Sequence, residues 1–486
     1  MICTVLKELA ELSLNFNFMT MKKELLSLLY IFMALSLKAN IRLPNILSSN
    51  MVLEQQSKTK LWGWAAPGEK IKIRCSWDNS FIETSADGNA RWEVDVHTPK
   101  AGGPYTITFQ GYNRIQLENI LIGEVWLCGG QSNMEYSYNQ GISSIRDEFK
   151  QLSKLKIRFF NIPKTTSRTP QDNVEGQWTV CDTLSIKAFS AVGYYFARYL
   201  NEDLNVPVGV ISSNWGGTPV ETWTPADLVE NNKELKQAAD KKTPSTWSPR
   251  APGYAYNAMI APLVNYGISG SIWYQGEANK NNALSYAGLM DTLIAAWRKD
   301  WRKDFPFYYV QIAPYRYDTY NVGALIREAQ TKNLSIPKTG MVVVSDLVGD
   351  TLDIHPKNKK DVGLRLANLA LAETYGIKKE GSKSPVFSSF SIGGGHVEIN
   401  FLYAQAGLVL RGQQPKEFYI AGADRVFYPA SVKIKGNKIL VSGKQVKAPV
   451  AVRYQFSNAG IGNLFSKSGL PVAPFRTDNW AVTAVR

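Results

Sequence analysis

Hydrophobic and polar residues alternate with a period of two in the part of the chain that follows residue 40. Residues 70–74 and 91–96 are alternately apolar and polar, and turn sequences such as Asp-Gly-Asn at 87–89 separate stretches of this kind. Short alternating strands bounded by turn residues are typical of a β-sandwich. The pattern therefore predicts an N-terminal β-sandwich module over residues 40–118.

The pattern changes from residue 119 to residue 377. Apolar residues recur at i, i+3, i+4 and i+7 over 192–200 and 286–297, which predicts two helices. Short apolar runs with few charges lie between the helical stretches, and strands buried on both faces have this composition. Strands that alternate with helices indicate an α/β domain with a parallel sheet covered on both faces. The runs are 125–128, 208–211, 268–274, 307–312 and 341–344.

Alternation returns over residues 378–486, which we interpret as a C-terminal β-rich module. Its clearest element is 432–434, a Gly436-Asn437 turn and 439–441. Two short alternating strands joined by a Gly-Asn turn predict a β-hairpin.

The N-terminal residues resemble a signal peptide. Lys22 and Lys23 provide a basic start, residues 25–37 an apolar stretch too short to cross a bilayer, and Ala39 a small residue at a plausible cleavage site. Because residues 1–20 fit no targeting pattern, we expect translation to begin at Met21. The prediction is a signal peptide at about 21–39, a dubious extension before it, and a periplasmic or secreted protein.

Composition and charge exclude several classes of protein. The 486 residues are 44% hydrophobic and 20% charged, as in a soluble globular protein, and the net charge is +14. No Lys/Arg block of the kind that binds nucleic acid is present. Cys75, Cys128 and Cys181 are too few and too far apart for a zinc site or a disulfide framework. We expect no metal, no other cofactor, no nucleic-acid partner and no membrane span, and the sequence leaves the oligomeric state open.

Four polar, glycine-bearing segments follow four of the predicted central strands. Because ligands bind at the carboxyl ends of the strands in an open parallel sheet, we expect these segments to share one site. The segments are Gly-Gly-Gln-Ser-Asn-Met at 129–134, Asn-Trp-Gly-Gly-Thr at 214–218, Gln-Gly-Glu-Ala-Asn at 275–279, and 346–356, which ends in Asp-Ile-His-Pro.

Ser132 and His355 are the candidates for nucleophilic chemistry in these segments. Ser132 follows two glycines at the predicted start of a helix, where free N–H groups stabilise negative charge. His355 is the histidine that falls in a strand-end segment of the α/β region, and a serine next to an imidazole is the basic unit of covalent acyl transfer. Met134 stands where an α/β-hydrolase elbow would need a glycine, so that fold is disfavoured.

The four segments together resemble the SGNH hydrolase superfamily, and closely resemble sialate O-acetylesterases and related carbohydrate acetylesterases. The motifs are Gly-Gln-Ser-Asn-Met at 130–134, Gly-Gly-Thr at 216–218, Trp-Tyr-Gln-Gly-Glu-x-Asn at 273–279 and Asp-Ile-His-Pro at 353–356. The resemblance implies an SGNH-type (flavodoxin-like) three-layer parallel-sheet domain flanked by β-sandwich-like accessory domains. It implies an esterase that removes acetyl groups from sugars, sialic acid above all.

The resemblance also assigns roles to residues. Ser132 would attack the acetyl carbonyl and His355 would act as the base. The backbone N–H groups of Ser132 and Gly217 would form the oxyanion hole with a side-chain amide, for which Gln275 and Asn279 are both candidates.

Further site residues follow from the same resemblance. Asp353 at position −2 is the first choice for the acid that orients His355, with Asp346, Asp350 or no acid as alternatives. We expect Glu277 to order its loop, and Arg327 to bind a substrate carboxylate. Gln131 and Asn133, on either side of the serine, are expected to support the site.

Three other functions remain open from the sequence. The chain could be an acetylesterase for plant polysaccharides such as xylan or pectin, or a glycan-binding surface protein without activity. Glu221 and Glu277 could instead form a glycosidase pair. Trp215, Trp223, Trp273, Tyr136 and Tyr138 flank the four segments, where aromatic rings either stack on sugars or fill the core.

Overall fold

The structure is a computed structural model that describes residues 40–78 and 81–482 and contains two compact units. Among the described residues, one unit comprises 40–43, 62–78, 81–94 and 107–116, and the other comprises 44–61, 95–106 and 117–482. The predicted signal peptide at 21–39 lies outside the described residues.

The first unit contains the antiparallel pair of β3 (Lys70–Cys75) and β4 (Phe81–Ser85). Strands β2 (Lys58–Trp64), β5 (Arg91–His97) and β6 (Gly102–Gln110) each have residues in both units; β6 pairs with β3 in antiparallel fashion, and β2 pairs with β5. Exposed and buried side chains alternate along β3, as the period of two predicts. The β-sandwich-like character of this accessory module is confirmed.

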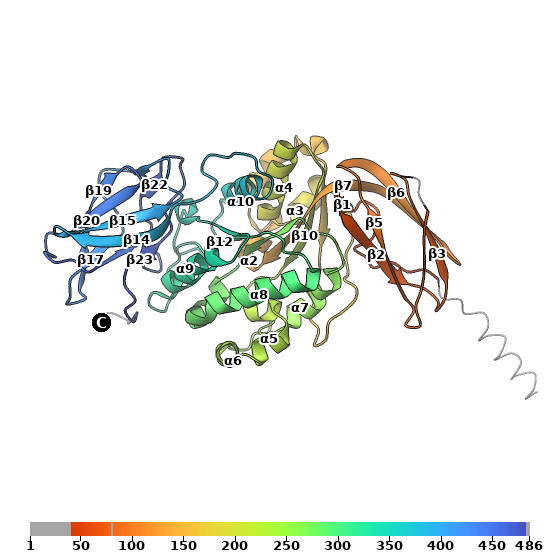
Figure 1. Ribbon diagram of the computed structural model, residues 1–486, viewed down its shortest axis with the longest axis horizontal. Coiled ribbons are helices and arrows are strands. Elements are labelled where there is room, and N and C mark those ends of the chain that lie inside the picture. Colours follow the sequence, from red (N-terminus) through yellow and green to blue (C-terminus); the bar gives the residue numbers. More distant parts are fainter. Residues whose placement is uncertain (1–39, 79–80, 483–486) are drawn as a thin grey trace, which may run out of the picture. The chain divides into compact units, whose positions relative to one another are not determined.

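A large mixed sheet forms the centre of the second unit (Figure 1). Its strand order is β13-β12-β11-β7-β10-β8-β9, and neighbouring strands are parallel except for the antiparallel pair of β8 and β9. The strands are β7 (Arg114–Gly130), β8 (Ile157–Asn161), β9 (Trp178–Val180), β10 (Val208–Asn214), β11 (Gly270–Tyr274), β12 (Phe307–Val310) and β13 (Thr339–Val342). The α/β prediction for this region is confirmed.

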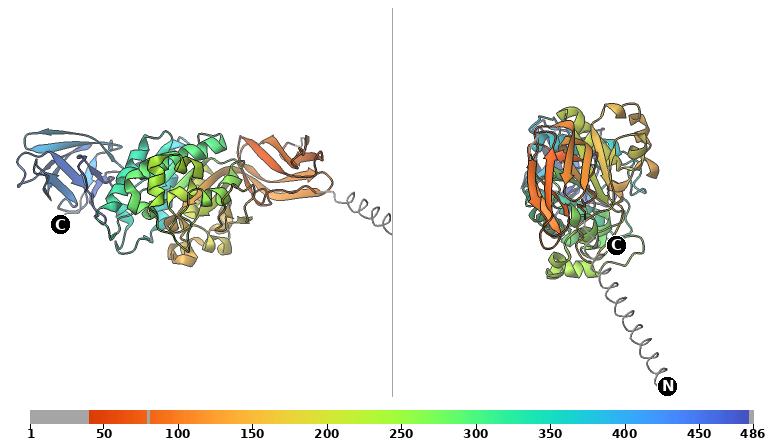
Figure 2. Two further views of the ribbon diagram at one scale, coloured as in Figure 1. Left: turned by 90° about the horizontal axis from the view of Figure 1, so that it is seen from below. Right: turned by 90° about the vertical axis from the view of Figure 1, so that its right-hand side faces the viewer.

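Helices cover both faces of this sheet. Figure 1 shows α4 and α10 on one side and α7 and α8 on the other, and the view from below in Figure 2 has the green helices in front of the sheet. Both helices predicted from apolar periodicity are present, as α4 and α8. The helices are α2 (Ser132–Glu135), α3 (Thr183–Ala188), α4 (Ala191–Leu204), α5 (Ala226–Glu230), α6 (Lys233–Asp240), α7 (Tyr254–Met259), α8 (Tyr286–Trp301), α9 (Val322–Lys332) and α10 (Lys359–Glu373).

The C-terminal part of the chain forms smaller antiparallel sheets around a core of its own. The predicted hairpin is present: β19 and β20 pair through Ile434 and Ile439, and Gly436 in the turn has a φ of 65°. The strands are β14 (Val386–Gly393), β15 (His396–Leu402), β16 (Leu408–Leu410), β17 (Phe418–Ala421), β18 (Phe427–Pro429), β19 (Ser431–Lys435), β20 (Lys438–Ser442), β21 (Ala451–Tyr454), β22 (Leu464–Ser466) and β23 (Phe475–Arg476).

Two features of the central sheet differ from the sequence pattern. Strand β8 escaped detection because Arg158 interrupts its apolar run; this arginine is nevertheless buried and donates to the carbonyl of Ile157 at 3.1 Å. Strand β7 runs without a break through residue 118, and β1 (Val52–Glu54) pairs with it in parallel at 121–123. Among the described residues, no helix combines the length and the apolar character needed to cross a membrane.

Candidate active site

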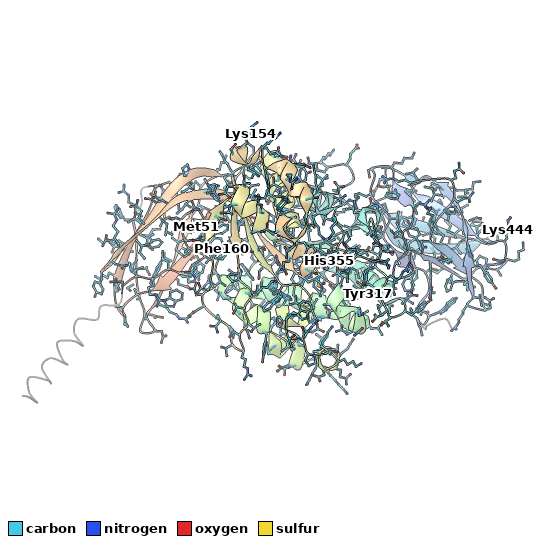
Figure 3. All side chains as sticks on the ribbon, turned by 180° about the vertical axis from the view of Figure 1, so that it is seen from behind. Met51, Lys154, Phe160, Tyr317, His355 and Lys444 are labelled. Carbon is cyan, nitrogen blue, oxygen red and sulfur yellow. The ribbon has the colours of Figure 1, made fainter. Side chains whose placement is uncertain are left out.

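One cavity of about 820 Å³ lies where the four polar segments meet at the carboxyl ends of the strands. Segments far apart in sequence share this edge because β7, β10 and β11 are parallel neighbours. Figure 3 labels His355 and Tyr317, two residues of its wall. From the four segments the wall takes Gln131, Ser132, Trp215, Gly216, Gly217, Glu277, Ala278, Ile354 and His355.

The turn between β7 and α2 presents Ser132 to this cavity. Gly130 has a φ of 136°, and a Cβ atom there would lie 2.2 Å from the carbonyl oxygen of Tyr274 on the neighbouring strand. Only glycine fits such a close approach in this conformation. The chain can therefore turn sharply, and Ser132 becomes the first residue of α2.

Ser132 and His355 are in hydrogen-bond contact. The distance from Ser132 Oγ to His355 Nε2 is 2.9 Å, although 223 positions separate the two residues. The Tyr136 ring stacks on the imidazole at 4.3 Å between centroids, and its hydroxyl lies 3.2 Å from His355 Nδ1. A hydroxyl held against an imidazole is the arrangement that activates a serine nucleophile.

Asp353 contacts the backbone of His355 more closely than its ring. Its Oδ1 accepts the backbone N–H of His355 at 2.9 Å, whereas Nδ1 of the ring is 3.7 Å away. Lys357 lies 3.4 Å from the other carboxylate oxygen. Partial burial works against the charged form, but the His355 N–H and Lys357 outweigh it and lower the pKa of Asp353. This carboxylate therefore acts on the imidazole through its charge, without a direct ring contact.

The two alternative acids have other partners. Asp346 forms a bidentate pair with Arg365, with both nitrogen–oxygen distances at 2.7 Å. Asp350 is exposed and accepts the backbone N–H of Leu352 at 2.8 Å. Neither carboxylate contacts His355, so Asp353 is the acid that the fold brings nearest.

A buried polar network links the residue after Ser132 to the residue before His355. The Asn133 side chain donates to Glu277 Oε1 at 2.6 Å and to the carbonyl of Ile354 at 3.0 Å, and it accepts from Lys359 Nζ at 2.5 Å. Because Ile354 precedes His355, this network fixes the backbone that carries the imidazole. Burial lowers the pKa of Lys359 to about 7 and raises the pKa of Glu277.

Burial and nearby positive charge keep His355 neutral. Burial lowers the pKa of its imidazole below the ordinary value of 6.5; Lys359 and Lys357 lower it further, while Asp353 and Glu135 raise it. Only a neutral imidazole can take a proton from Ser132. The His355 imidazole is therefore able to accept a proton at neutral pH.

The candidate oxyanion donors divide into two groups. Ser132 and Gly217 border the cavity, and the structure records no hydrogen bond from either backbone N–H to another described residue. Gln275 and Asn279, the candidate amides, are fully buried and do not line the cavity. Gln275 Nε2 donates to the carbonyl of Thr218 and to Asn279 Oδ1, and Asn279 Nδ2 donates to Glu221. Their donors are thus turned into the protein.

Gln131 is a third side-chain amide near Ser132, in addition to Gln275 and Asn279, which were the expected candidates for the oxyanion hole. It lines the cavity, and its Oε1 accepts the backbone N–H groups of Gly276 and Ala278 at 3.4 and 3.2 Å. No described residue accepts from its Nε2. With its oxygen anchored on the third segment, Gln131 is the side-chain amide next to Ser132 that lines the cavity.

The structure places Arg327 away from the cavity, which corrects its expected role. Its side chain is 1% exposed, and its guanidinium donates to the carbonyls of Gln455, Ser457 and Asn458 in the C-terminal part. Burial lowers the pKa of this guanidinium to about 10. Arg327 therefore joins the catalytic region to the C-terminal sheets and cannot meet a substrate carboxylate there.

The glycosidase pair is also separated. Glu221 is fully buried, accepts hydrogen bonds from Asn279 and Asn282, and does not border the cavity that Glu277 lines. Two carboxylates must flank a glycosidic bond for such a reaction.

The aromatic residues divide in the same way between cavity and core. Trp215 and Tyr136 line the cavity, whereas Trp223 and Trp273 are fully buried and pack edge-to-face at 6.1 Å. Tyr138 stands outside the cavity, where it accepts a hydrogen bond from Arg146. Trp215 and Tyr136 are therefore the aromatic residues of this set that a bound sugar can reach.

The sequence patterns predicted neither the burial of Lys359 beside the site nor the stacking of Tyr136 on the imidazole. Lys359 follows His355 by four positions and begins α10, but a lysine in a polar segment is usually exposed. Its burial depends on Asn133 and Glu277, which come from two other segments, so no local pattern could reveal it.

A serine hydroxyl in contact with an imidazole, in the wall of a cavity bordered by N–H groups that donate to no described residue, is the arrangement of a nucleophilic acyl hydrolase. Comparison with known proteins gives the particular family. Residues 122–372 match the family described as "Carbohydrate esterase, sialic acid-specific acetylesterase". The chain belongs to this family and is an esterase.

Relatives and a solved structure extend the similarity beyond residues 122–372. The sialate O-acetylesterase of Rattus norvegicus is 29% identical over 446 residues, covering 78% of this chain and 82% of that protein. The human sialate O-acetylesterase is 28% identical over 383 residues, or 71% and 73% of the two chains. The crystal structure of a carbohydrate acetylesterase from Xanthomonas citri superimposes with a TM-score of 0.82 at 36% identity, covering 90% of this chain and all of that one.

Proposed function

We propose that this esterase removes O-acetyl groups from sialic acids, as a sialate O-acetylesterase, through an acetyl-enzyme intermediate on Ser132. The observation that carries the mechanism is the 2.9 Å contact between Ser132 Oγ and His355 Nε2 in the wall of a cavity. The SGNH-type classification belongs to the same proposal, and the four motif segments at the carboxyl ends of parallel strands support it.

The charge of the cavity supports an acidic sugar. Five cationic side chains line it, against two carboxylates, Glu135 and Glu277. An excess of positive charge in a cavity favours anionic ligands, and sialic acid carries a carboxylate at neutral pH. The volume of about 820 Å³ is that of an ordinary small-molecule site. The five cations are Lys164, Lys241, Lys242, Arg250 and Lys280.

The geometry supports a two-step reaction. Ser132 Oγ attacks the acetyl carbon while His355 Nε2 takes its proton, and the N–H groups of Ser132 and Gly217 receive the negative oxygen. His355 then gives the proton to the sugar oxygen as the bond between that oxygen and the acetyl carbon breaks, and the sugar leaves with a free hydroxyl. Water attacks the acetyl-enzyme with His355 again as base, releasing acetate and restoring Ser132.

Acetate release from a panel of acetylated glycans tests this proposal. The panel comprises O-acetylated sialic acid, acetylated xylan and acetylated pectin, with Ser132→Ala as the blank. We expect the highest kcat/KM on the sialic acid and a loss on the order of 10⁴- to 10⁶-fold in the blank. A higher kcat/KM on acetylated xylan or pectin would contradict sialic acid as the substrate. Acetate release that is undiminished in Ser132→Ala would refute the mechanism.

We also propose that the protein is exported, on the basis of the signal-like pattern at 21–39. N-terminal sequencing of protein from the native host, separated into cell and exported fractions, tests this. A mature chain that begins near Asn40 in the exported fraction is the expected result. An uncleaved chain confined to the cytoplasm would contradict it.

A further inference from the structure

The segment of residues 241–253, between α6 and α7, supplies one wall of the catalytic cavity. Its Trp247 is 60% exposed, and the Trp215 indole donates to the Trp247 carbonyl at 3.0 Å. The Trp247 ring stands directly against Gly217: a Cβ atom there would lie only 1.9 Å from the ring. The segment is thus packed against the loop that offers the oxyanion donor.

Arg250 lies on the same wall, with its guanidinium 5.9 Å from the centroid of the Trp247 ring. It is half-buried, and its Nε is enclosed without a hydrogen-bond partner. Among the described residues the structure records no hydrogen bond and no ion pair for this guanidinium. A planar cation that has lost part of its hydration therefore remains unpaired beside the catalytic serine's cavity.

Other cations of the cavity are already engaged. Lys164 pairs with Glu135 at 2.6 Å, and Lys280 pairs with Asp318 at 2.5 Å. Lys242 is nearly buried and donates to Asn282 at 2.6 Å and to the carbonyl of Ala278 at 3.1 Å. These three lysines are held by the protein, and Lys241, the fifth cation, is exposed. Arg250 is therefore the half-buried cation of the cavity for which no hydrogen bond or ion pair with a described residue is recorded.

The chemistry of the guanidinium group indicates which kind of anion Arg250 would bind. Its parallel N–H groups match the two oxygens of a carboxylate, and such bidentate pairs are among the strongest hydrogen bonds in proteins. Glu221, the nearby acid whose charge acts on Arg250, is committed to Asn279 and Asn282. Trp247, which is 60% exposed, adds an aromatic side chain beside Arg250 and Gly217 on which the apolar face of a sugar ring can pack.

We propose that Arg250 binds the carboxylate of the acidic sugar and that Trp247 packs against its ring while the acetyl group reaches Ser132. This subsite deepens the proposed function and rests on it. In a sialic acid the carboxylate and the glycerol side chain are borne by two different carbons of one rigid ring, those on either side of the ring oxygen. A carboxylate held by Arg250 therefore orients the glycerol side chain relative to the nucleophile.

Arg250→Gln tests the subsite because it removes the charge and keeps much of the side chain. The substrates are O-acetylated N-acetylneuraminic acid, its carboxamide analogue and an aryl acetate, which reports the state of the Ser132 machinery. We expect kcat/KM for the acid to fall about 10- to 100-fold more than for the aryl acetate, mainly through KM. The kcat/KM of Arg250→Gln for the carboxamide analogue should fall no more than its kcat/KM for the aryl acetate. Lys233→Gln, an exposed cation on α6, is the matched control.

A second readout separates this proposal from the proposed function. Free N-acetylneuraminic acid should inhibit aryl acetate hydrolysis, and Arg250→Gln should raise its inhibition constant about 10-fold or more while Lys233→Gln does not. Equal losses on the acid and the carboxamide, or equal inhibition of both variants, would overturn the subsite. Hydrolysis of the aryl acetate without hydrolysis of the acetylated sialic acid would overturn the proposed function. In that case, inhibition by free N-acetylneuraminic acid would still show whether Arg250 binds the carboxylate.

Discussion

Replacing Asp353 by asparagine tests whether the catalytic unit works as a pair or as a full triad. Asparagine keeps an oxygen that can accept the backbone N–H of His355, a contact of 2.9 Å in the structure, and removes the negative charge. The variant therefore isolates the electrostatic effect of the carboxylate on the imidazole. Asp350→Asn is the matched control, because that carboxylate is exposed in the same segment and does not contact His355.

The distance and exposure of Asp353 determine how much kcat should fall in Asp353→Asn. Two unit charges about 4 Å apart interact with about 1 kcal/mol in water and about 4 kcal/mol near a protein surface. Asp353 lies 3.7 Å from His355 Nδ1, but its side chain is 41% exposed, and Lys357 offsets its charge from 3.4 Å. Solvent screening therefore favours the lower value, and about 1 kcal/mol corresponds to a five- to tenfold fall in kcat.

The measurement is kcat on an aryl acetate as a function of pH. The charge of Asp353 raises the pKa of His355, so its removal lowers that pKa, and the acid limb of the profile moves to lower pH. A loss of about 10⁴-fold, as in a triad whose acid bonds the ring directly, would refute the argument from distance and exposure. A kcat equal to that of Asp350→Asn would show that the charge of Asp353 has no effect on the imidazole, which would also refute the argument.

Further predictions concern the base, the buried lysine and the oxyanion loop. In the unmodified protein, the acid limb of kcat/KM should have its midpoint below 6.5, since burial and Lys359 lower the pKa of His355; a midpoint above 6.5 contradicts this. Lys359→Met should move that midpoint to higher pH by removing a positive charge, whereas Lys360→Met, exposed on the same helix, should leave it in place. Gly217→Ala should lower kcat about 100-fold, because its φ is 71° and the new Cβ would collide with Trp247, displacing the donor N–H. Retention of kcat within threefold would remove Gly217 from the oxyanion hole.

Local patterns determined the elements of this protein and the segments that form its site. The hairpin of β19 and β20 and the helix α8 follow from the spacing of apolar residues, because a strand repeats every two residues and a helix every 3.6. The convergence of the motif segments follows from parallel strands ending at one edge. These properties depend on near neighbours in the chain or on a general rule of sheet geometry, so a sequence can reveal them.

The tertiary structure decided which side chains of those segments reach the cavity. Gln275 and Asn279 were equal candidates by type and position, yet both point into the core, and Gln131 presents the free amide instead. Arg327 was assigned to substrate, but its guanidinium binds carbonyls of the C-terminal part, and Lys359 became buried through contacts with distant segments. The direction of a side chain depends on partners that arrive from elsewhere in the sequence. Packing and hydrogen bonding between those partners, rather than the local order of residues, settle it.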